Sequence, residues 1–192
     1  RLDSACLAIG APAGAKRAGG FPDRLAVAFR ALPVPVIAKE VGWGISDSIV
    51  KQLINVGVAA IDVSGAGGTS WTQVERFRLV DPIGIKVAEA FLDWGIPTAD
   101  ALIKVRNSFP ELPIFASGGL KTGMDVAKSL ALGANLAGMA GVFLRSAVTS
   151  PDYLEETITI FEKIIRISMF VTGSKDLISF SKEKIFKTGD NS

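Results

Sequence analysis

Two glycine-rich segments that follow predicted buried strands carry the clearest chemical signal in this sequence. Residues 116–123 read Ala-Ser-Gly-Gly-Leu-Lys-Thr-Gly, and residues 138–141 read Gly-Met-Ala-Gly one strand later. Glycines at such positions let the backbone approach an anion closely, and free N–H groups at a helix start favour a phosphate. A glycine pair alone often makes only a tight turn. The second small-residue loop, one strand–helix unit later, favours a phosphate site over that alternative.

A third glycine-rich segment, residues 62–71, follows another predicted strand. It holds three glycines within residues 65–68, and Ser64 and Thr69 offer hydroxyl groups to a ligand. An ordinary flexible loop is an equally good interpretation of this segment taken alone. Asp62 lies within the strand itself, so we expect its carboxylate to be hydrogen-bonded inside the fold rather than bound to a metal.

A lysine ends a further apolar run, Val-Ile-Ala-Lys-Glu at residues 36–40. Burying an unpaired ammonium group is costly, so Lys39 requires an anionic partner. That partner is either Glu40 or Asp62 in a salt bridge, or the negative charge of a bound cofactor. A Schiff base with a carbonyl substrate is the weaker option, because no second basic residue lies close to Lys39 in the sequence.

The composition excludes several classes of function. The 192 residues contain no histidine and one cysteine, so neither histidine-dependent nucleophilic pairs nor an internal disulfide can form. Lys and Arg total 21 against 19 Asp and Glu, a balance that predicts neither a nucleic-acid nor a membrane partner. The longest uncharged run, residues 129–144, is shorter than the roughly 20 apolar residues of a membrane span. We expect a cytoplasmic protein whose chemistry depends on carboxylates, lysines or a cofactor.

Strands and helices are predicted to alternate along the chain. Amphipathic stretches predict helices that begin near Ser46, Thr98 and Gly123, and a longer helix over residues 154–170. This alternation indicates a parallel α/β architecture, either an open doubly wound sheet or a closed barrel. Short apolar runs predict the buried strands, at residues 5–9, 34–38, 59–64, 114–117 and 136–140.

The distribution of the loops favours the barrel. Lys39 and the glycine-rich segments are spread over the ends of several strands, whereas a doubly wound sheet would concentrate such residues at one switch point. Five predicted strands are too few for a closed barrel of eight. We therefore expect the C-terminal five or so βα units of a (β/α)8 TIM barrel over residues 1–173, with residues 174–192 as a partly ordered tail. Such an open half-barrel exposes strand edges and apolar surface, which predicts a homo-oligomer.

Several longer segments resemble one family. VIAKEVGWGIS, AAIDVSGAGGTSW, DWGIPT, FASGGLKTGMDVAKSLALGA and MFVTGSK are similar, in the same order, to segments of the FMN-dependent (type 2) isopentenyl-diphosphate isomerases. The resemblance covers residues 33–175. It implies a TIM-barrel flavoprotein of isoprenoid biosynthesis that interconverts isopentenyl diphosphate and dimethylallyl diphosphate, with FMN, Mg²⁺, and NADPH as the flavin reductant.

The same resemblance assigns cofactor-binding residues. Lys39 would face the flavin ring and balance its anionic reduced form. Ser64 and Thr69 would line the flavin and its ribityl chain. The two glycine-rich loops would hold the FMN phosphate through Gly119, Leu120, Lys121, Ala140 and Gly141.

The front of the chain departs from this family. After its corresponding strand the family carries a Gln that touches the substrate and a Glu that binds Mg²⁺, whereas residues 8–15 read Ala-Ile-Gly-Ala-Pro-Ala-Gly-Ala. Neither residue type occurs before Glu40, so no catalytic and no metal-binding residue is predicted. Two alternatives stay open. One is an FMN-binding TIM-barrel oxidoreductase, and the other is a non-catalytic half-barrel fragment that binds a phosphate ligand.

Overall fold

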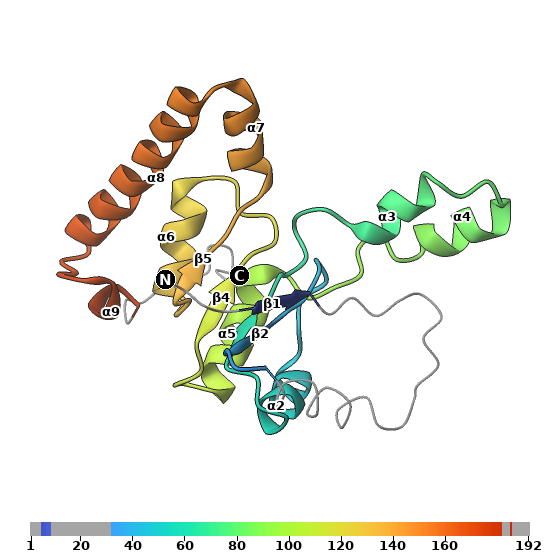
Figure 1. The fold of residues 1–192 in the computed structure, drawn as a ribbon, viewed down its shortest axis with the longest axis horizontal. Coiled ribbons are helices and arrows are strands. Elements are labelled where there is room, and N and C mark those ends of the chain that lie inside the picture. Colours follow the sequence, from blue (N-terminus) through green and yellow to red (C-terminus); the bar gives the residue numbers. More distant parts are fainter. Residues whose placement is uncertain (1–4, 9–31, 182–184, 186–192) are drawn as a thin grey trace, which may run out of the picture.

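A parallel β-sheet forms the centre of the structure (Figure 1). The computed structural model describes residues 5–8, 32–181 and 185, with only the backbone described for residues 5–8. The five predicted strands are confirmed. The last four are shorter than expected, and Ile9, the predicted end of the first, lies outside the described residues. The strands are β1 (Ala5–Ala8), β2 (Val36–Lys39), β3 (Ala60–Asp62), β4 (Ile114–Ala116) and β5 (Leu136–Ala137).

The order of the strands identifies the winding of the sheet. They lie side by side in chain order, β1-β2-β3-β4-β5, and every neighbouring pair is parallel. A doubly wound sheet reverses its order at a switch point, whereas a (β/α)8 barrel adds each strand beside the previous one. The fold is therefore of the TIM-barrel type, and five consecutive strands of it are described. This winding places the carboxyl ends of all these strands at one edge.

Half of the helices in the described part of the chain follow the predicted stretches, and the other half were not predicted. The unpredicted ones are short or lie in segments without a clear apolar period. The predicted helices are α2 (Asp47–Asn55), α5 (Thr98–Ser108), α6 (Gly123–Ala131) and α8 (Pro151–Val171). The unpredicted helices are α3 (Trp71–Arg76), α4 (Pro82–Glu89), α7 (Gly141–Thr149) and α9 (Leu177–Phe180).

Local sequence explains where the predicted helices begin and end. The hydroxyl of Ser46 accepts the N–H of Ile49 at 3.4 Å and caps α2, which is followed by Gly57 at a φ of 99°. Pro97 takes the N-cap position of α5, so Thr98 is its first helical residue rather than its cap. Gly133, with a φ of 99°, follows α6 as expected for a C-terminal glycine.

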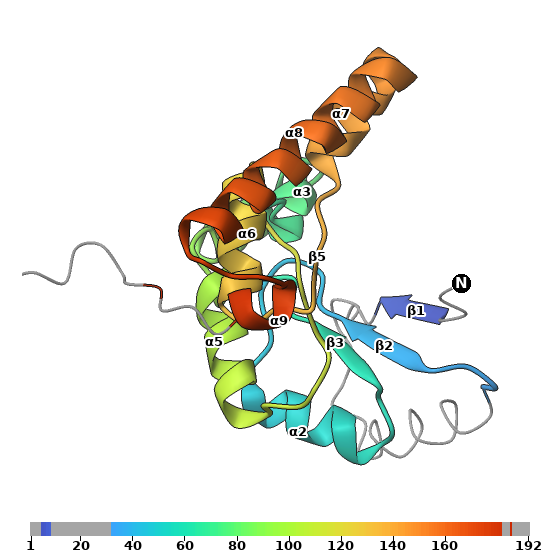
Figure 2. The same ribbon diagram turned by 90° about the vertical axis from the view of Figure 1, so that its left-hand side faces the viewer.

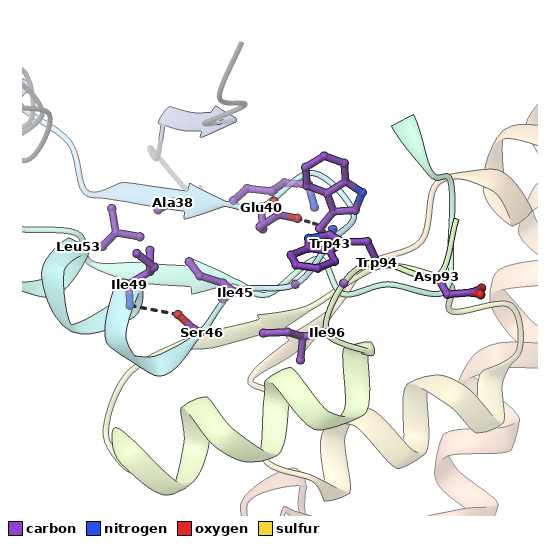
Figure 3. A pocket seen from close by; sticks show the side chains of 13 residues that line it. Ala38, Glu40, Trp43, Ile45, Ser46, Ile49, Leu53, Asp93, Trp94 and Ile96 are labelled. Carbon is purple, nitrogen blue, oxygen red and sulfur yellow. Dashed lines mark hydrogen bonds between the residues drawn. The ribbon is translucent and has the colours of Figure 1, made fainter. Parts of the chain in front are cut away.

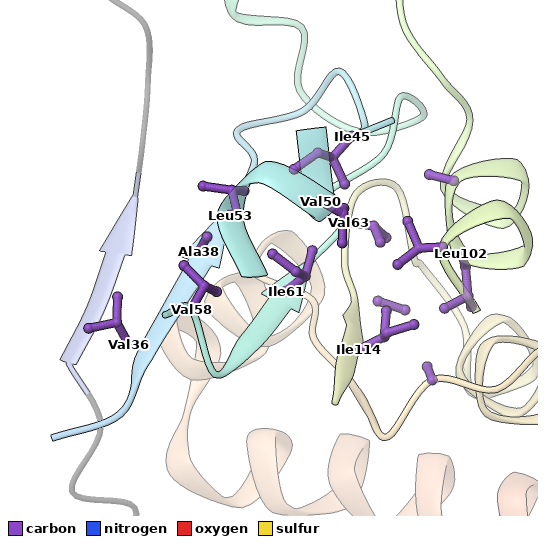
Figure 4. Close-up of a cluster of buried hydrophobic side chains, with 14 residues drawn as sticks. Val36, Ala38, Ile45, Val50, Leu53, Val58, Ile61, Val63, Leu102 and Ile114 are labelled. Carbon is purple, nitrogen blue, oxygen red and sulfur yellow. The ribbon is translucent and has the colours of Figure 1, made fainter. Parts of the chain in front are cut away.

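The main core lies between the sheet and the helices α2 and α5 (Figure 4). Alternate strand residues enter it: Val36 and Ala38 from β2, Ile61 from β3, and Ile114 from β4. A second cluster joins α6 to α8 and α9 around the buried Phe180. Residues 177–180 of the predicted tail thus pack on the body of the fold, while the boundary expected at residue 174 stays a prediction.

Two helix pairs project from the sheet in different directions. α3 and α4 form an arm on one side, and α7 with α8 forms a hairpin that extends beyond the other helices (Figures 1 and 2). Large apolar side chains are exposed on both, for example Val80 at 96% and Phe170 at 84%. None of the helices in the described ranges is long and apolar enough to span a bilayer.

Candidate cofactor site

The polar groups of the site come from strand residues that alternate with those of the buried core. Lys39 ends β2, Asp62 ends β3, and Ser117 directly follows β4. Lys39 is paired with Asp62 in the register of β2 and β3, so their side chains leave the same face of the sheet. That face lies opposite the α2–α5 core, because the neighbouring residues Ala38, Ile61 and Ala116 are the buried ones.

These three side chains form one hydrogen-bonded cluster. Nζ of Lys39 donates to Oδ2 of Asp62 and to Oγ of Ser117, both at 2.7 Å. Oγ of Ser117 donates in turn to Oδ1 of Asp62 at 2.7 Å. The Lys39 side chain is 31% exposed and that of Asp62 13%, so the ion pair is partly shielded but reaches the surface. Of the two salt-bridge partners allowed by the sequence, Asp62 is the observed one, while Glu40 accepts two N–H groups of the turn that follows it.

Ser64 joins the same cluster through its backbone. Its φ of 33° is the only positive value outside glycine among the described residues. Its N–H donates to Oδ1 of Asp62 at 3.1 Å. Asp62 therefore holds both this turn and the Lys39 side chain. Ser64 is buried, whereas Thr69 at the far end of the loop is exposed. The structure therefore places Ser64 at the Lys39 cluster and Thr69 at the rim of the loop.

The glycine-rich loops after β3 and β4 pack backbone against backbone. The N–H of Gly65 donates to the carbonyl of Ser117 at 2.9 Å. A Cβ atom added at Gly118 would collide with the carbonyl oxygen of Gly65. The hydroxyl of Thr98, the buried first residue of α5, closes this contact by donating to the carbonyl of Gly118 at 2.6 Å. Close packing of two loops, and not an anion alone, thus requires glycine at these positions.

The loop after β4 contains backbone N–H groups that are free to bind a ligand. Within the described part of the chain, the N–H groups of Gly119 and Leu120 donate to no protein acceptor. The N–H of Lys121 donates to Oδ2 of Asp125 at 3.0 Å, within the capping box of α6. Burial alone would raise the pKa of the Asp125 carboxyl, but hydrogen bonds from Lys121 and Thr122 outweigh burial and hold this pKa below its ordinary value. Lys121 therefore offers a ligand its ammonium group and not its N–H.

The loop after β5 leads directly into α7. Ala140 occupies the N-cap position, no side chain caps the helix, and its first turn holds no acidic residue. The free N–H groups of such a turn carry partial positive charge. The guanidinium of Arg145 folds back over this turn, since a Cβ atom added at Gly141 would lie 3.5 Å from its Nη1. Because β4 and β5 pair in register, both loops leave neighbouring strands at one edge. Their N–H groups and cations suit a phosphate.

A cavity of about 600 Å³ adjoins the end of β2 (Figure 3). Its walls come from β2, the start of α2 and residues 93–96. Figure 3 shows Trp43 and Trp94 among the side chains that line it, with Asp93 pointing away. Lys39 also lines this mostly apolar space, so the cavity opens beside the cluster. Neither tryptophan was singled out from the sequence.

Two further polar residues were missed as candidates. Ser117 could have been identified from the sequence, since it is a polar residue at the end of a predicted apolar strand, as Asp62 is in the preceding strand. Arg145 stands one helical turn after Gly141, but only the structure shows its guanidinium beside the loop. Within the described ranges, no three His, Cys, Asp or Glu side chains gather to form a metal site. The segment at residues 9–15 that departs from the isomerase pattern lies outside the described residues.

Comparison with known proteins finds relatives among flavin enzymes. A family model described as FMN-dependent dehydrogenase matches residues 22–187. The isopentenyl-diphosphate delta-isomerase of Rickettsia felis is 46% identical over 154 residues, and that of Stutzerimonas stutzeri is 46% identical over 156. These alignments cover 80% and 81% of this chain but 45% of each relative. The chain thus spans less than half the length of the curated relatives that it matches.

Solved structures share the fold at low sequence identity. A lactate oxidase of Pediococcus acidilactici superposes with a TM-score of 0.67 at 21% identity, over 85% of this chain and 39% of that one. A GMP reductase from Trypanosoma brucei superposes with a TM-score of 0.63 at 20% identity, over 92% of this chain and 38% of that one. At these identities the likeness concerns the fold alone.

Proposed function

The chain belongs to the FMN-dependent dehydrogenase family, and we propose from this that it is the flavin-binding portion of an FMN-dependent isopentenyl-diphosphate isomerase. The observation that carries the proposal is the placement of Lys39 and two phosphate-type loops at one edge of a singly wound sheet. The curated relatives at 46% identity are named isopentenyl-diphosphate delta-isomerase, which supports isopentenyl and dimethylallyl diphosphate as the substrates.

The FMN phosphate would bind at the loops after β4 and β5. The free N–H groups of Gly119 and Leu120 would donate to it from one side, and those of Ala140 and Gly141, at the start of α7, from the other. The ammonium of Lys121 and the guanidinium of Arg145 supply two positive charges for a phosphate that carries nearly two negative ones. The residues that are present therefore fit the phosphate end of FMN.

The flavin ring would lie over the cluster at the ends of β2 and β3. FMN supplies the redox-active ring, and Lys39 supplies positive charge where the reduced ring becomes anionic. Ser64 is held at this cluster by Asp62, and the exposed hydroxyl of Thr69 lies further along the same loop. These two residues would accordingly contact the ring and the ribityl chain.

Isomerisation of the substrate requires the addition of a proton to one carbon and its removal from another. The contribution proposed for this chain is to hold FMN and to tune its ring. Mg²⁺ at the diphosphate and NADPH as the source of electrons belong to the proposed activity of the whole enzyme. A cytoplasmic location and a homo-oligomeric state are part of the same proposal.

A comparison of FMN with riboflavin tests the cofactor assignment, because riboflavin has the same ring without the phosphate. The full chain is titrated with each ligand and the quenching of flavin fluorescence is followed. FMN should bind more tightly than riboflavin, and Arg145→Met should weaken FMN by about tenfold while riboflavin is unaffected. Arg166→Met, on the exposed side of α8, is the matched control. Equal affinities of the wild-type chain for both ligands, or no binding of either, would contradict the proposal.

An FMN-dependent oxidoreductase is the second candidate, favoured by the description of the family model. Such an enzyme needs a base or electrophile beside the flavin. This group is commonly a histidine, and this chain contains no histidine. Anaerobic incubation of the FMN-loaded chain with a 2-hydroxy acid separates the two. Bleaching of the bound flavin would favour the oxidoreductase, and an unchanged spectrum would count against it.

A further inference from the structure

Asp62 is hydrogen-bonded to every other member of the cluster around Lys39. It accepts three hydrogen bonds, from Nζ of Lys39, Oγ of Ser117 and the N–H of Ser64. Both of its oxygens are therefore in use, and its side chain is only 13% exposed. Lys39 has three ammonium hydrogens, of which two are committed to Asp62 and Ser117. One hydrogen is left for a ligand.

We propose that Asp62 is a positioning residue that aims this remaining hydrogen at the flavin ring and, by compensating the charge of Lys39, lowers the reduction potential of bound FMN. The inference rests on the proposed function, because it requires FMN at this edge of the sheet. An ammonium 2.7 Å from a carboxylate acts on a third group largely as a dipole. Its field is weaker than that of a lone cation.

The consequence follows from the charge balance of reduction. Two electrons and one proton convert oxidised FMN to its anionic reduced form, which adds one negative charge to the ring. An uncompensated Lys39 would favour that charge more strongly than the Lys39–Asp62 pair does. Replacing the carboxylate by an amide of the same shape should therefore tighten reduced FMN relative to oxidised FMN.

This direction separates charge compensation from simple support. If Asp62 only held Lys39 in place, its loss would mimic the loss of Lys39 and make the potential more negative. If Asp62 compensates the charge, Asp62→Asn and Lys39→Met should shift the potential in opposite directions. Ser117→Ala is the matched control, because it removes one hydrogen bond of Lys39 but leaves the ion pair intact.

The experiment is an anaerobic redox titration of FMN bound to the full chain, with dithionite as reductant and solvent water as proton source. For Asp62→Asn we expect the preference for reduced over oxidised FMN to rise about tenfold, which is about 30 mV more positive for a two-electron couple. Lys39→Met should move the potential to more negative values. Ser117→Ala should change the preference by less than about twofold.

Each result has a defined meaning. An unchanged or more negative potential for Asp62→Asn overturns the inference while the FMN proposal stands. A wild-type chain that binds no FMN overturns both. Should Asp62→Asn fail to fold, Asp62→Ser serves instead, since a serine hydroxyl can still accept the N–H two residues on. The same positive shift is then required.

Discussion

A Cβ atom added at Gly119 would lie 2.9 Å from Cα of Gly67 and closer still to its carbonyl group. The loops after β3 and β4 are thus locked together through their backbones, although their sequences lie about fifty residues apart. A substitution at Gly119 therefore perturbs the contact between these loops before any phosphate is bound. Positions on the loop after β5, where such a collision is absent at Gly141, report more directly on ligand binding.

Gly119→Ala should destabilise the ligand-free chain by about 3 kcal/mol in urea unfolding. About 1 kcal/mol of this comes from placing an L-residue at a φ of 79°, and the rest from the collision with Gly67. Gly57→Ala is the matched control, because Gly57 has a φ of 99° with nothing within 4 Å of an added Cβ. Equal losses in the two variants would show that the loops can separate freely.

Arg106→Met should lower the free energy of unfolding by about 3 kcal/mol. Its guanidinium donates to the carbonyl of Gly133 at 2.6 and 3.0 Å, to that of Leu112 at 2.9 Å, and to Oδ1 of Asn135 at 2.8 Å. Burial lowers the pKa of Arg106, with Glu111 opposing that shift, and methionine would leave several carbonyls without a partner. Arg78→Met, which breaks an exposed pair, should cost under about 0.5 kcal/mol. Similar losses from both substitutions would argue against this role.

The chain should self-associate in solution. Phe77 is 79% exposed and Val80 is 96% exposed on the α3–α4 arm, and Phe170 on α8 is 84% exposed. Sedimentation velocity should show oligomers or aggregates, and a dye for apolar surface should bind. The double substitution Phe77→Glu and Val80→Glu should reduce both signals, whereas Arg78→Glu at the same site should not. A monomeric wild-type chain that melts cooperatively with low dye binding would count against an open half-barrel.

This chain alone should show no isomerase turnover. The assay follows conversion of isopentenyl to dimethylallyl diphosphate with FMN, dithionite and Mg²⁺, with and without a chelator. The expectation rests on the sequence before Glu40, which contains no Gln or Glu that could touch the substrate or anchor the metal. Turnover that the chelator abolishes would instead show that the chain supplies these groups from another position.

Much of the architecture is determined by the sequence. Apolar runs identify all five strands, because burial on both faces leaves a continuous apolar signature. The amphipathic stretches between and after them identify the helices α2, α5, α6 and α8. The glycine-rich segments and Lys39 mark the strand ends that carry polar chemistry. The α3–α4 arm and α7 were not predicted; these helices are 6, 8 and 9 residues long, and each contributes at most one buried residue to the fold.

Only the tertiary structure decides how these residues meet. The sequence allows Lys39 to pair with Glu40 or Asp62, and the parallel register of β2 and β3 selects Asp62 by placing it directly opposite. Ser117 joins the pair from 78 residues away because β4 follows β3 in the sheet. Glycine spacing alone cannot distinguish an anion cradle from a backbone contact. That distinction depends on which loop lies beside which, and the order of the strands in the sheet sets it.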